Sequence, residues 1–285
     1  MEKFNYILDK IKRAEFEQMP FKHLLINNLF SDEHLEIILS DNQIHFPPVT
    51  GKEELVEKLS ENDYAVINFP GSTQDVDKYF KCLEENKWDN IHVSLADGEL
   101  EGYGVIYRLG SYKERFILDL MSFMQGPLFK EAIEQKFGLT EPTRIVSEIQ
   151  KYLTKYEISP HSDIRGKALT YLININKNSK SEQMDIHTHL LEFKDEYRHI
   201  YDIWKNDTKR DRCWVPWRWC QTKKQMNKNN SMIIFAPNND TLHAVKLDYD
   251  HNESQRTQIY GNLMYINPKR YDRLFYKDLI TSEED

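Results

Sequence analysis

The sequence predicts a mainly β protein with flanking helices, in which the second half of the chain forms an antiparallel barrel or jelly roll. From about Arg144 onward, short runs rich in β-branched and aromatic residues are separated by turns, a pattern typical of antiparallel sheets. We expect strands at residues 145–158, 168–176, 184–193, 231–235 and 257–266. The preceding residues mix helical spacing with short apolar runs, so we expect them to support the barrel.

In the first 140 residues, local signals mark the starts and ends of several elements. An apolar run at 24–30 ends at Ser31, a good helix N-cap, which predicts a helix through about residue 39. Residues 64–69 are expected to form a buried strand, and residues 72–83 a helix. A longer helix over 115–137 should be interrupted at Gly126-Pro127, because proline cannot donate the helical hydrogen bond.

The domain organisation follows from the change, at about residue 141, from mixed helical and strand patterns to mainly strand-like runs. We expect residues 1–140 to be an α/β supporting region and residues 141–270 to be the core, with an irregular, aromatic-rich insertion at 194–230. Residues 271–285 would be a C-terminal tail. A chain of 285 residues could hold one large domain or two ordinary ones, and we expect one integrated domain.

Composition limits the partners and the compartment. The 38 basic and 46 acidic residues give a net charge of −8, so a nucleic acid is not expected as the main partner. The sequence has no apolar run of roughly 18–20 residues, the length that spans a bilayer, and its opening is too polar for a secretory signal. We therefore expect a cytoplasmic protein, with a periplasmic location as the alternative. Three cysteines, Cys82, Cys213 and Cys220, are expected to be free thiols in a reducing compartment.

A candidate metal-binding pair follows the first long strand. Pro160 stiffens the exit of that strand, and His161 and Asp163 come directly after it. In an extended segment, residues two apart leave on the same side, so both side chains can reach one ion. A similar pair, His34-Leu35-Glu36, falls inside the helix expected after Ser31, where residues two apart do not face each other. The pattern alone is therefore not specific.

Residues further along the chain complete the pattern. His243 follows a buried strand and a turn, and it can supply a third ligand. Two histidines and one carboxylate can hold Fe(II) on one face and leave the other positions open. Thirteen residues after His243, Arg256 opens the last strand, and its planar guanidinium could grip a carboxylate with two hydrogen bonds.

Taken in order, these segments resemble the catalytic core of the 2-oxoglutarate/Fe(II)-dependent dioxygenases, particularly the prolyl-hydroxylase-like branch. The resemblance covers somewhat under half of the chain and implies a double-stranded β-helix, the jelly-roll core that cupins also have. It departs from the family at 184–189, where a Gly-Gly turn is common. The matching segments are 24–39, 160–163, 168–176, 235–237, 241–245 and Arg256.

The resemblance also implies a site and a reaction. Arg256 would hold the distal carboxylate of the co-substrate 2-oxoglutarate, with Tyr152 and Thr257 as further candidates. Dioxygen would be the second co-substrate, and 2-oxoglutarate would be converted to succinate and CO2. Hydroxylation of an unactivated carbon is the expected outcome, although desaturation or ring closure would use the same residues. The implied Fe(II) ligands are His161, Asp163 and His243.

The substrate is less well indicated. An acidic enzyme with an aromatic insertion suits a small molecule, such as an amino acid or a biosynthetic intermediate, and hydroxylation of a protein or peptide residue is the alternative. Trp217, Arg218 and Trp219 in the insertion could form a wall against the substrate, or the indoles could pack the insertion onto the barrel. Arg165 could meet an anionic substrate group. The oligomeric state stays open.

A rival metal motif lies at His187-Thr188-His189, with Glu192 close behind. A His-x-His pair on a strand places both rings on one face, as in metal-binding cupins. Under that alternative the chain would be a cupin-like metal-binding jelly roll without oxygenase activity, and Arg256 would have no role.

Overall fold

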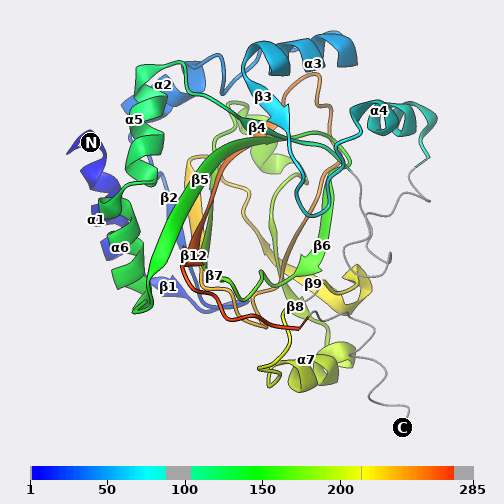
Figure 1. Ribbon diagram of the computed structural model, residues 1–285. Coiled ribbons are helices and arrows are strands. Elements are labelled where there is room, and N and C mark those ends of the chain that lie inside the picture. Colours follow the sequence, from blue (N-terminus) through cyan, green and yellow to red (C-terminus); the bar gives the residue numbers. More distant parts are fainter. Residues whose placement is uncertain (1, 88–103, 213, 273–285) are drawn as a thin grey trace.

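The structure is a computed structural model that describes residues 2–87, 104–212 and 214–272 (Figure 1). Cys213 and most of the expected tail at 271–285 lie outside these residues. The helices are α1 (Asn5–Arg13), α2 (Asp32–Ser40), α3 (Lys52–Glu61), α4 (Val76–Glu85), α5 (Arg115–Met124), α6 (Pro127–Phe137) and α7 (Arg198–Trp204). The strands are β1 (Phe16–Glu17), β2 (His23–Asn27), β3 (Tyr64–Val66), β4 (Ile106–Leu109), β5 (Thr143–Tyr152), β6 (Glu157–His161), β7 (Lys167–Asn174), β8 (His189–Phe193), β9 (Cys220–Gln225), β10 (Ser231–Phe235), β11 (His243–Lys246) and β12 (Arg256–Tyr265).

The last eight of these strands form the core by nested antiparallel pairing. The first pairs with the last, β5 with β12, and then β6 pairs with β11, β7 with β10 and β8 with β9. Successive strands alternate between a major sheet, in which β10, β7, β12 and β5 are neighbours, and a minor sheet of order β6-β11-β8-β9, except that β8 and β9 both lie in the minor sheet. This nesting is a jelly roll, so the predicted double-stranded β-helix is confirmed.

The N-terminal region widens the major sheet at both edges. β2 pairs with β10 and carries β1 outside it, whereas β4 pairs with β5 and carries β3. Figure 1 shows α1, α5 and α6 lying along the side of this sheet that faces away from the minor sheet. The first 140 residues therefore cover the core strands on their edges and on one face, which protects exposed sheet edges.

Strand alternation separates the apolar core from the interior of the jelly roll. On β7, Leu169, Tyr171 and Ile173 are fully buried in the cluster that α1, α5 and α6 cover. Thr170 and Leu172, which point the other way, line a cavity between the two sheets. Successive side chains in a strand leave on opposite faces, so one strand can build a hydrophobic core and a polar site at once.

Several local signals in the sequence acted as expected. Ser31 caps α2, its side chain accepting a hydrogen bond from the His34 backbone N–H. The helix expected at 115–137 is two helices, because α5 ends at Met124 and Pro127 starts α6. For the helix expected at 72–83, the cap is Asp75, and the helix itself is α4.

Three strand predictions needed correction. The single strand expected at 145–158 is divided into β5 and β6 by a turn in which Lys155 has φ +57°, and this turn moves the chain from the major to the minor sheet. The strand expected at 184–193 begins only at His189. The insertion expected at 194–230 contains β9, a full member of the minor sheet, so the irregular part ends near Trp219. Strand β9 was missed because its sequence is mostly polar.

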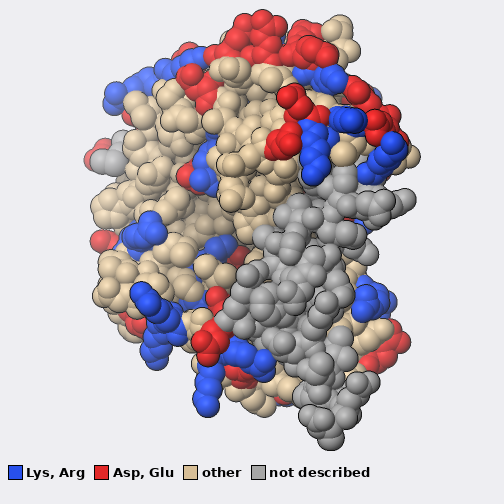
Figure 2. All heavy atoms as spheres, turned by 45° about the vertical axis from the view of Figure 1, so that its right-hand side comes forward, with Lys and Arg blue, Asp and Glu red and all other residues tan. Residues whose placement is uncertain are grey.

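The surface carries its acidic groups unevenly. Figure 2 shows acidic side chains gathered at the top of the molecule, the end at which α3 lies in Figure 1. There α3 and α4 border a groove of about 880 Å³. Carboxylates at this groove would repel nucleic-acid phosphates. Its acidic residues are Glu53, Glu57, Glu61, Asp77 and Glu84.

Among the described helices, none is both long enough and apolar enough to span a membrane.

Gly261 is a packing constraint at the centre of the major sheet. It lies opposite Tyr171 on β7 and opposite Ser147 on β5, and Tyr171 and Ser147 share a hydrogen bond across it. A Cβ at position 261 would overlap the Tyr171 ring, which is fully buried against Phe129. The glycine is therefore required by the close approach of the ring.

We expect Gly261→Ala to lower the free energy of unfolding by about 1–3 kcal/mol, because the buried Tyr171 ring has to move. Urea denaturation of the purified variant measures this. Gly166→Ala is the matched control, since a Cβ there meets only ordinary contacts, at 3.7 Å or more, and should change stability by less than about 0.5 kcal/mol. Equal stability of both variants would contradict the role assigned to Gly261.

Lys151 is a second unusual core residue, with 1% of its surface exposed. Its ammonium lies 2.6 Å from the Ile44 carbonyl oxygen and 2.9 Å from Thr257 Oγ1, and 4.6 Å from the centre of the Phe46 ring. Burial lowers the pKa of Lys151 to about 7 from an ordinary 10.5, although Asp41 opposes the shift. Between pH 7 and pH 10.5, Lys151 is protonated in the unfolded chain but largely deprotonated in the folded chain. Its contribution therefore makes the free energy of unfolding rise with pH over this range.

We therefore expect the free energy of unfolding of the wild type to increase from pH 7 to pH 9 relative to that of Lys151→Met, by on the order of 2 kcal/mol. Urea denaturation of both proteins at the two pH values tests this. Parallel pH dependences would mean that Lys151 keeps its proton in the folded state.

Candidate metal centre

The cavity between the two sheets has a volume of about 210 Å³ and is largely apolar. Strand β12 forms one wall, contributing Arg256, Gln258 and Tyr260 at alternating positions. Thr170 and Leu172 of β7 lie beside them. The opposite wall comes from the minor sheet and from the loop that follows β6. A small number of polar groups in a mostly apolar, concave space is the usual composition of a ligand site.

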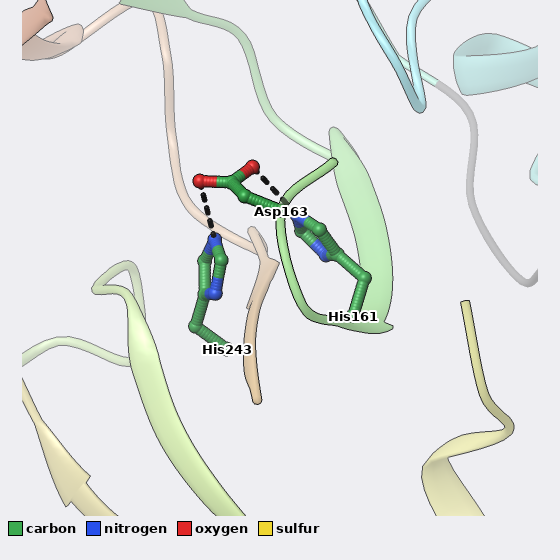
Figure 3. Close-up of side chains that lie close together, drawn as sticks. All are labelled: His161, Asp163 and His243. Atoms are coloured by element: carbon green, nitrogen blue, oxygen red, sulfur yellow. Dashed lines mark ion pairs between the residues drawn. The ribbon is translucent and has the colours of Figure 1, made fainter. Parts of the chain in front are cut away.

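Three potential metal ligands meet in this cavity (Figure 3). His161 is the last residue of β6, Asp163 lies in the loop just after it, and His243 is the first residue of β11. His161 and His243 are direct partners in the β6–β11 pairing, and their ring centres lie 4.3 Å apart. One nitrogen or oxygen atom from each of the three residues lies within 4.8 Å of the others. Antiparallel pairing thus brings together residues 82 positions apart.

Both histidines are oriented by backbone carbonyl groups. Nδ1 of His161 lies 2.8 Å from the Ser159 carbonyl oxygen, and Nδ1 of His243 lies 3.0 Å from that of Thr241. A carbonyl oxygen only accepts, so these contacts are hydrogen bonds when the proton is on Nδ1. Nε2 of each ring then carries a free lone pair and points toward Asp163, at 3.8 Å for His161 and 3.9 Å for His243. This is the support that metal-binding histidines usually have.

Asp163 is held by two donors. Lys167 Nζ donates to Oδ1 at 2.6 Å, and the Thr170 hydroxyl donates to Oδ2. Only 7% of the Asp163 side chain is exposed, and 14% of that of Lys167. The pair is therefore a buried salt bridge, in which each charge depends on the other for its neutralisation.

The environment sets the charges of the ligands. Burial and the neighbouring His243 lower the pKa of His161 to about 3, and burial also lowers the pKa of His243. Burial would raise the pKa of Asp163, but Lys167 and the two histidines hold it below its usual range. The three residues thus present two neutral imidazoles and one carboxylate at neutral pH, the protonation states that can bind a metal.

Arg256 lies at the other end of the cavity wall on β12, with 2% of its surface exposed. Its Nη2 donates to Thr188 Oγ1 at 3.3 Å, and its guanidinium carbon lies 4.6 Å from the centre of the Tyr152 ring. The buried Nε has no hydrogen-bond partner among the described residues. A buried guanidinium without a carboxylate partner is costly, so this position suits an anionic ligand.

Of the two other residues expected to bind the co-substrate, one lines the cavity and the other does not. Tyr152 lines the cavity beside Arg256, its direct partner in the β5–β12 pairing. Thr257 faces the opposite side of β12, where its hydroxyl accepts from Lys151 and donates to the Gln255 carbonyl oxygen. Strand alternation therefore places Thr257 away from the cavity.

The residues of the rival motif do not form a shared site. His187 contacts the Ser181 carbonyl oxygen through Nε2, whereas His189 contacts Thr222 through Nδ1. Glu192 pairs with Lys223. Over the described residues, the group of His, Cys, Asp and Glu side chains close enough to share an ion is His161, Asp163 and His243.

Three of the four residues expected to contact substrate have other partners. The Trp217 indole donates to Glu157, Trp219 stacks on Tyr197, and Arg218 is exposed. Arg165 donates to the backbone carbonyl groups of two residues in the insertion. None of the four is part of the cavity wall, and the placement of Trp219 follows the packing alternative, since it belongs to a buried apolar cluster under α7.

The structure adds cavity residues that were not among the expected site residues: Lys167, Tyr260 and Thr188. Trp214, one of the three indoles of the insertion, also lines the cavity. Trp214 stacks on His161 with ring centres 5.7 Å apart. Tyr260 could have been found, because it lies four residues after Arg256 on the same strand and so shares its face. Lys167 gave no local signal, since its position depends on how the loop after β6 crosses the cavity.

No family model and no curated protein matches the sequence. Three solved structures with similar chain paths are a prolyl-4-hydroxylase from Pseudomonas putida, a prolyl hydroxylase from Trichoplax adhaerens in complex with a hypoxia inducible factor peptide, and a 2OG-Fe(II) oxygenase family oxidoreductase from Burkholderia pseudomallei. Identities are 9%, 12% and 9%, and TM-scores are 0.45, 0.42 and 0.36. The alignments cover 92%, 93% and 80% of this chain and 98%, 90% and 98% of those chains.

Asp163→Ala should destabilise the metal-free protein by about 3 kcal/mol, because it leaves the Lys167 ammonium buried without its partner. The double variant Asp163→Ala/Lys167→Met should recover most of this loss. Urea denaturation in the presence of a chelator measures both. His161→Ala is the matched control that keeps the ion pair, and a loss as large as that of Asp163→Ala would contradict this account.

Proposed function

We propose that this chain is an Fe(II)- and 2-oxoglutarate-dependent oxygenase that hydroxylates an unactivated carbon of a small organic molecule. The observation that carries the proposal is the pairing of two features in one cavity. A buried His-Asp-His group can bind a metal at one place, and a buried arginine with an unpartnered nitrogen can bind a carboxylate at another.

The donor set suits iron. His161 and His243 offer Nε2 atoms and Asp163 offers a carboxylate oxygen, and one such atom from each residue lies within 4.8 Å of the others (Figure 3). Such a facial set leaves coordination positions open for other ligands, which is the requirement for binding a co-substrate and dioxygen at the same metal. A structural zinc site would instead have four protein ligands.

Arg256 supplies the second requirement. A dicarboxylate that reaches the metal with one end can place its other carboxylate on the guanidinium of Arg256, beside Tyr152 and Thr188. Because that guanidinium is fixed in place, the bound dicarboxylate would be held in one orientation. 2-Oxoglutarate has this shape, with a metal-chelating 2-oxo acid at one end and a carboxylate at the other.

When bound, Fe(II) with 2-oxoglutarate and dioxygen supplies the oxidising chemistry. The chain itself orients the two histidines through Ser159 and Thr241, holds Asp163 ionised through Lys167, and keeps bulk water out with apolar walls. A cavity of about 210 Å³ favours a small molecule over a folded protein as substrate. Succinate and CO2 would leave with the oxidised product.

Anaerobic titration with Fe(II) and then 2-oxoglutarate tests the proposal. We expect a weak visible metal-to-ligand charge-transfer band that requires both additions. His161→Ala should abolish it, because a metal ligand is lost. Arg256→Ala should raise the 2-oxoglutarate concentration needed for half of the band by about tenfold or more, because a charged hydrogen bond is lost.

His189→Ala is the matched control, since this histidine lies outside the three-residue group. It should leave the band unchanged. A protein that binds metal through His187 and His189 and shows no band with 2-oxoglutarate would contradict the proposal and favour the cupin-like alternative.

A further inference from the structure

Among the described residues that line the cavity, Lys167 is the basic side chain in contact with a candidate metal ligand. Its Nζ lies 2.6 Å from Asp163 Oδ1 and 3.0 Å from the hydroxyl oxygen of Tyr260. The ammonium also lies 5.6 Å from the centre of the Tyr260 ring. The side chain is therefore fixed by contacts on two sides, and its charge is placed at the cavity.

The charges in the cavity do not balance once both proposed ligands are bound. Among the described residues that line it, the charged side chains are Asp163, Lys167 and Arg256, since a histidine that ligates a metal through Nε2 is neutral. The two charges of Fe(II) are matched by Asp163 and by the 2-oxo acid carboxylate, and Arg256 is matched by the distal carboxylate. Because Lys167 shares Asp163 with the metal, the cavity keeps one net positive charge in a largely apolar space, which is unfavourable.

Lys167 and Tyr260 together have two donors left over. An ammonium has three N–H groups, and two of them are used by Asp163 and by the Tyr260 oxygen. Tyr260 accepts from Lys167, so its own O–H proton remains free to donate. These adjacent donors, on atoms 3.0 Å apart, can each serve one oxygen of a carboxylate.

The position of this donor pair differs from that of the co-substrate anchor. Tyr260 lies four residues from Arg256 along β12, which is about 13 Å at the rise of a β-strand. Around the pair the walls are apolar: the Phe69 ring packs edge-on against Tyr260, with ring centres 5.5 Å apart, and Ile164 and Trp214 also line the cavity. A ligand held here would combine one anionic group with an apolar body.

We propose that Lys167 and Tyr260 bind the carboxylate of a monoanionic substrate with an apolar or aromatic body, and so determine the substrate class. This inference rests on the proposed function, because it counts the charges of Fe(II) and 2-oxoglutarate. A dianion such as a phosphate monoester would leave an excess negative charge, so a single carboxylate is the better match.

The test uses the full chain as its anaerobic complex with Fe(II) and saturating 2-oxoglutarate. The probes are benzoate, phenylacetate and 3-phenylpropionate, each compared with its own primary amide at millimolar concentrations by isothermal titration calorimetry. We expect at least one acid to bind about tenfold or more tightly than its amide, since only the acid can pair with Lys167. The charge-transfer band is followed in parallel to show that 2-oxoglutarate stays bound.

Two variants test whether the preference for the acid over the amide comes from Lys167 and Tyr260. Lys167→Met should bind acid and amide equally while keeping the band with 2-oxoglutarate, and Tyr260→Phe should weaken acid binding severalfold while leaving amide binding unchanged. If Lys167→Met does not bind Fe(II), the comparison of acid and amide binding by Tyr260→Phe alone tests the inference. Lys130→Met is the control, because Lys130 pairs with Glu134 on α6 outside the cavity.

Three results would overturn the inference while the proposed function stands: no acid binds, acids bind no better than amides, or the preference survives in both variants. Loss of 2-oxoglutarate binding in Lys167→Met, with Arg256→Ala unaffected, would instead make Lys167 the co-substrate anchor. A wild type without the charge-transfer band would contradict the proposed function itself, and this inference with it.

Discussion

The pairing of β12 with both β5 and β7 is the constraint on which the rest of the structure depends. It runs over the whole of β12 on the β5 side, joining the strand that starts the jelly roll to the strand that ends it. The close approach at Gly261 lets Tyr171 fill the space beneath the helices. The same strand turns Arg256, Gln258 and Tyr260 toward the cavity. Because strand side chains alternate, a shift of one residue would exchange the core and the site.

The site itself depends on a balance of buried charge. Asp163 would be costly in an apolar cavity, and so would Lys167, but each neutralises the other at 2.6 Å. Thr170 and the carbonyl groups behind the histidines hold the ligand atoms in place before any ion binds. A prearranged site loses less conformational entropy when a ligand binds. The Nε of Arg256 is the complementary case, because among the described residues this buried group has no hydrogen-bond partner.

Much of the core and the proposed ligand set could be predicted from the sequence, because local rules determine both. Runs rich in β-branched and aromatic residues indicated the strands, Ser31 marked a helix start, and Gly126-Pro127 marked the interruption between two helices. The spacing of two between His161 and Asp163 is the one expected for an extended segment. Strand β9 was missed because its sequence, CQTKKQ, lacks a buried apolar face that would distinguish it from a loop. The turn between β5 and β6 was missed because its residues are as apolar and aromatic as a strand.

The sequence by itself therefore determined the fold class and indicated the two histidines and the carboxylate that could bind a metal; it also indicated Arg256, whose role as a carboxylate anchor stays a proposal. Only the tertiary structure decided which side chains share the cavity. It placed Trp217, Arg218, Trp219 and Arg165 outside the cavity wall and turned Thr257 to the far side of β12. It also brought Lys167 and Tyr260, 93 residues apart, within hydrogen-bond distance beside Asp163. The physical reason is that side-chain alternation acts within a segment, whereas a charged contact between distant segments depends on how strands pair and how loops and sheets pack in three dimensions.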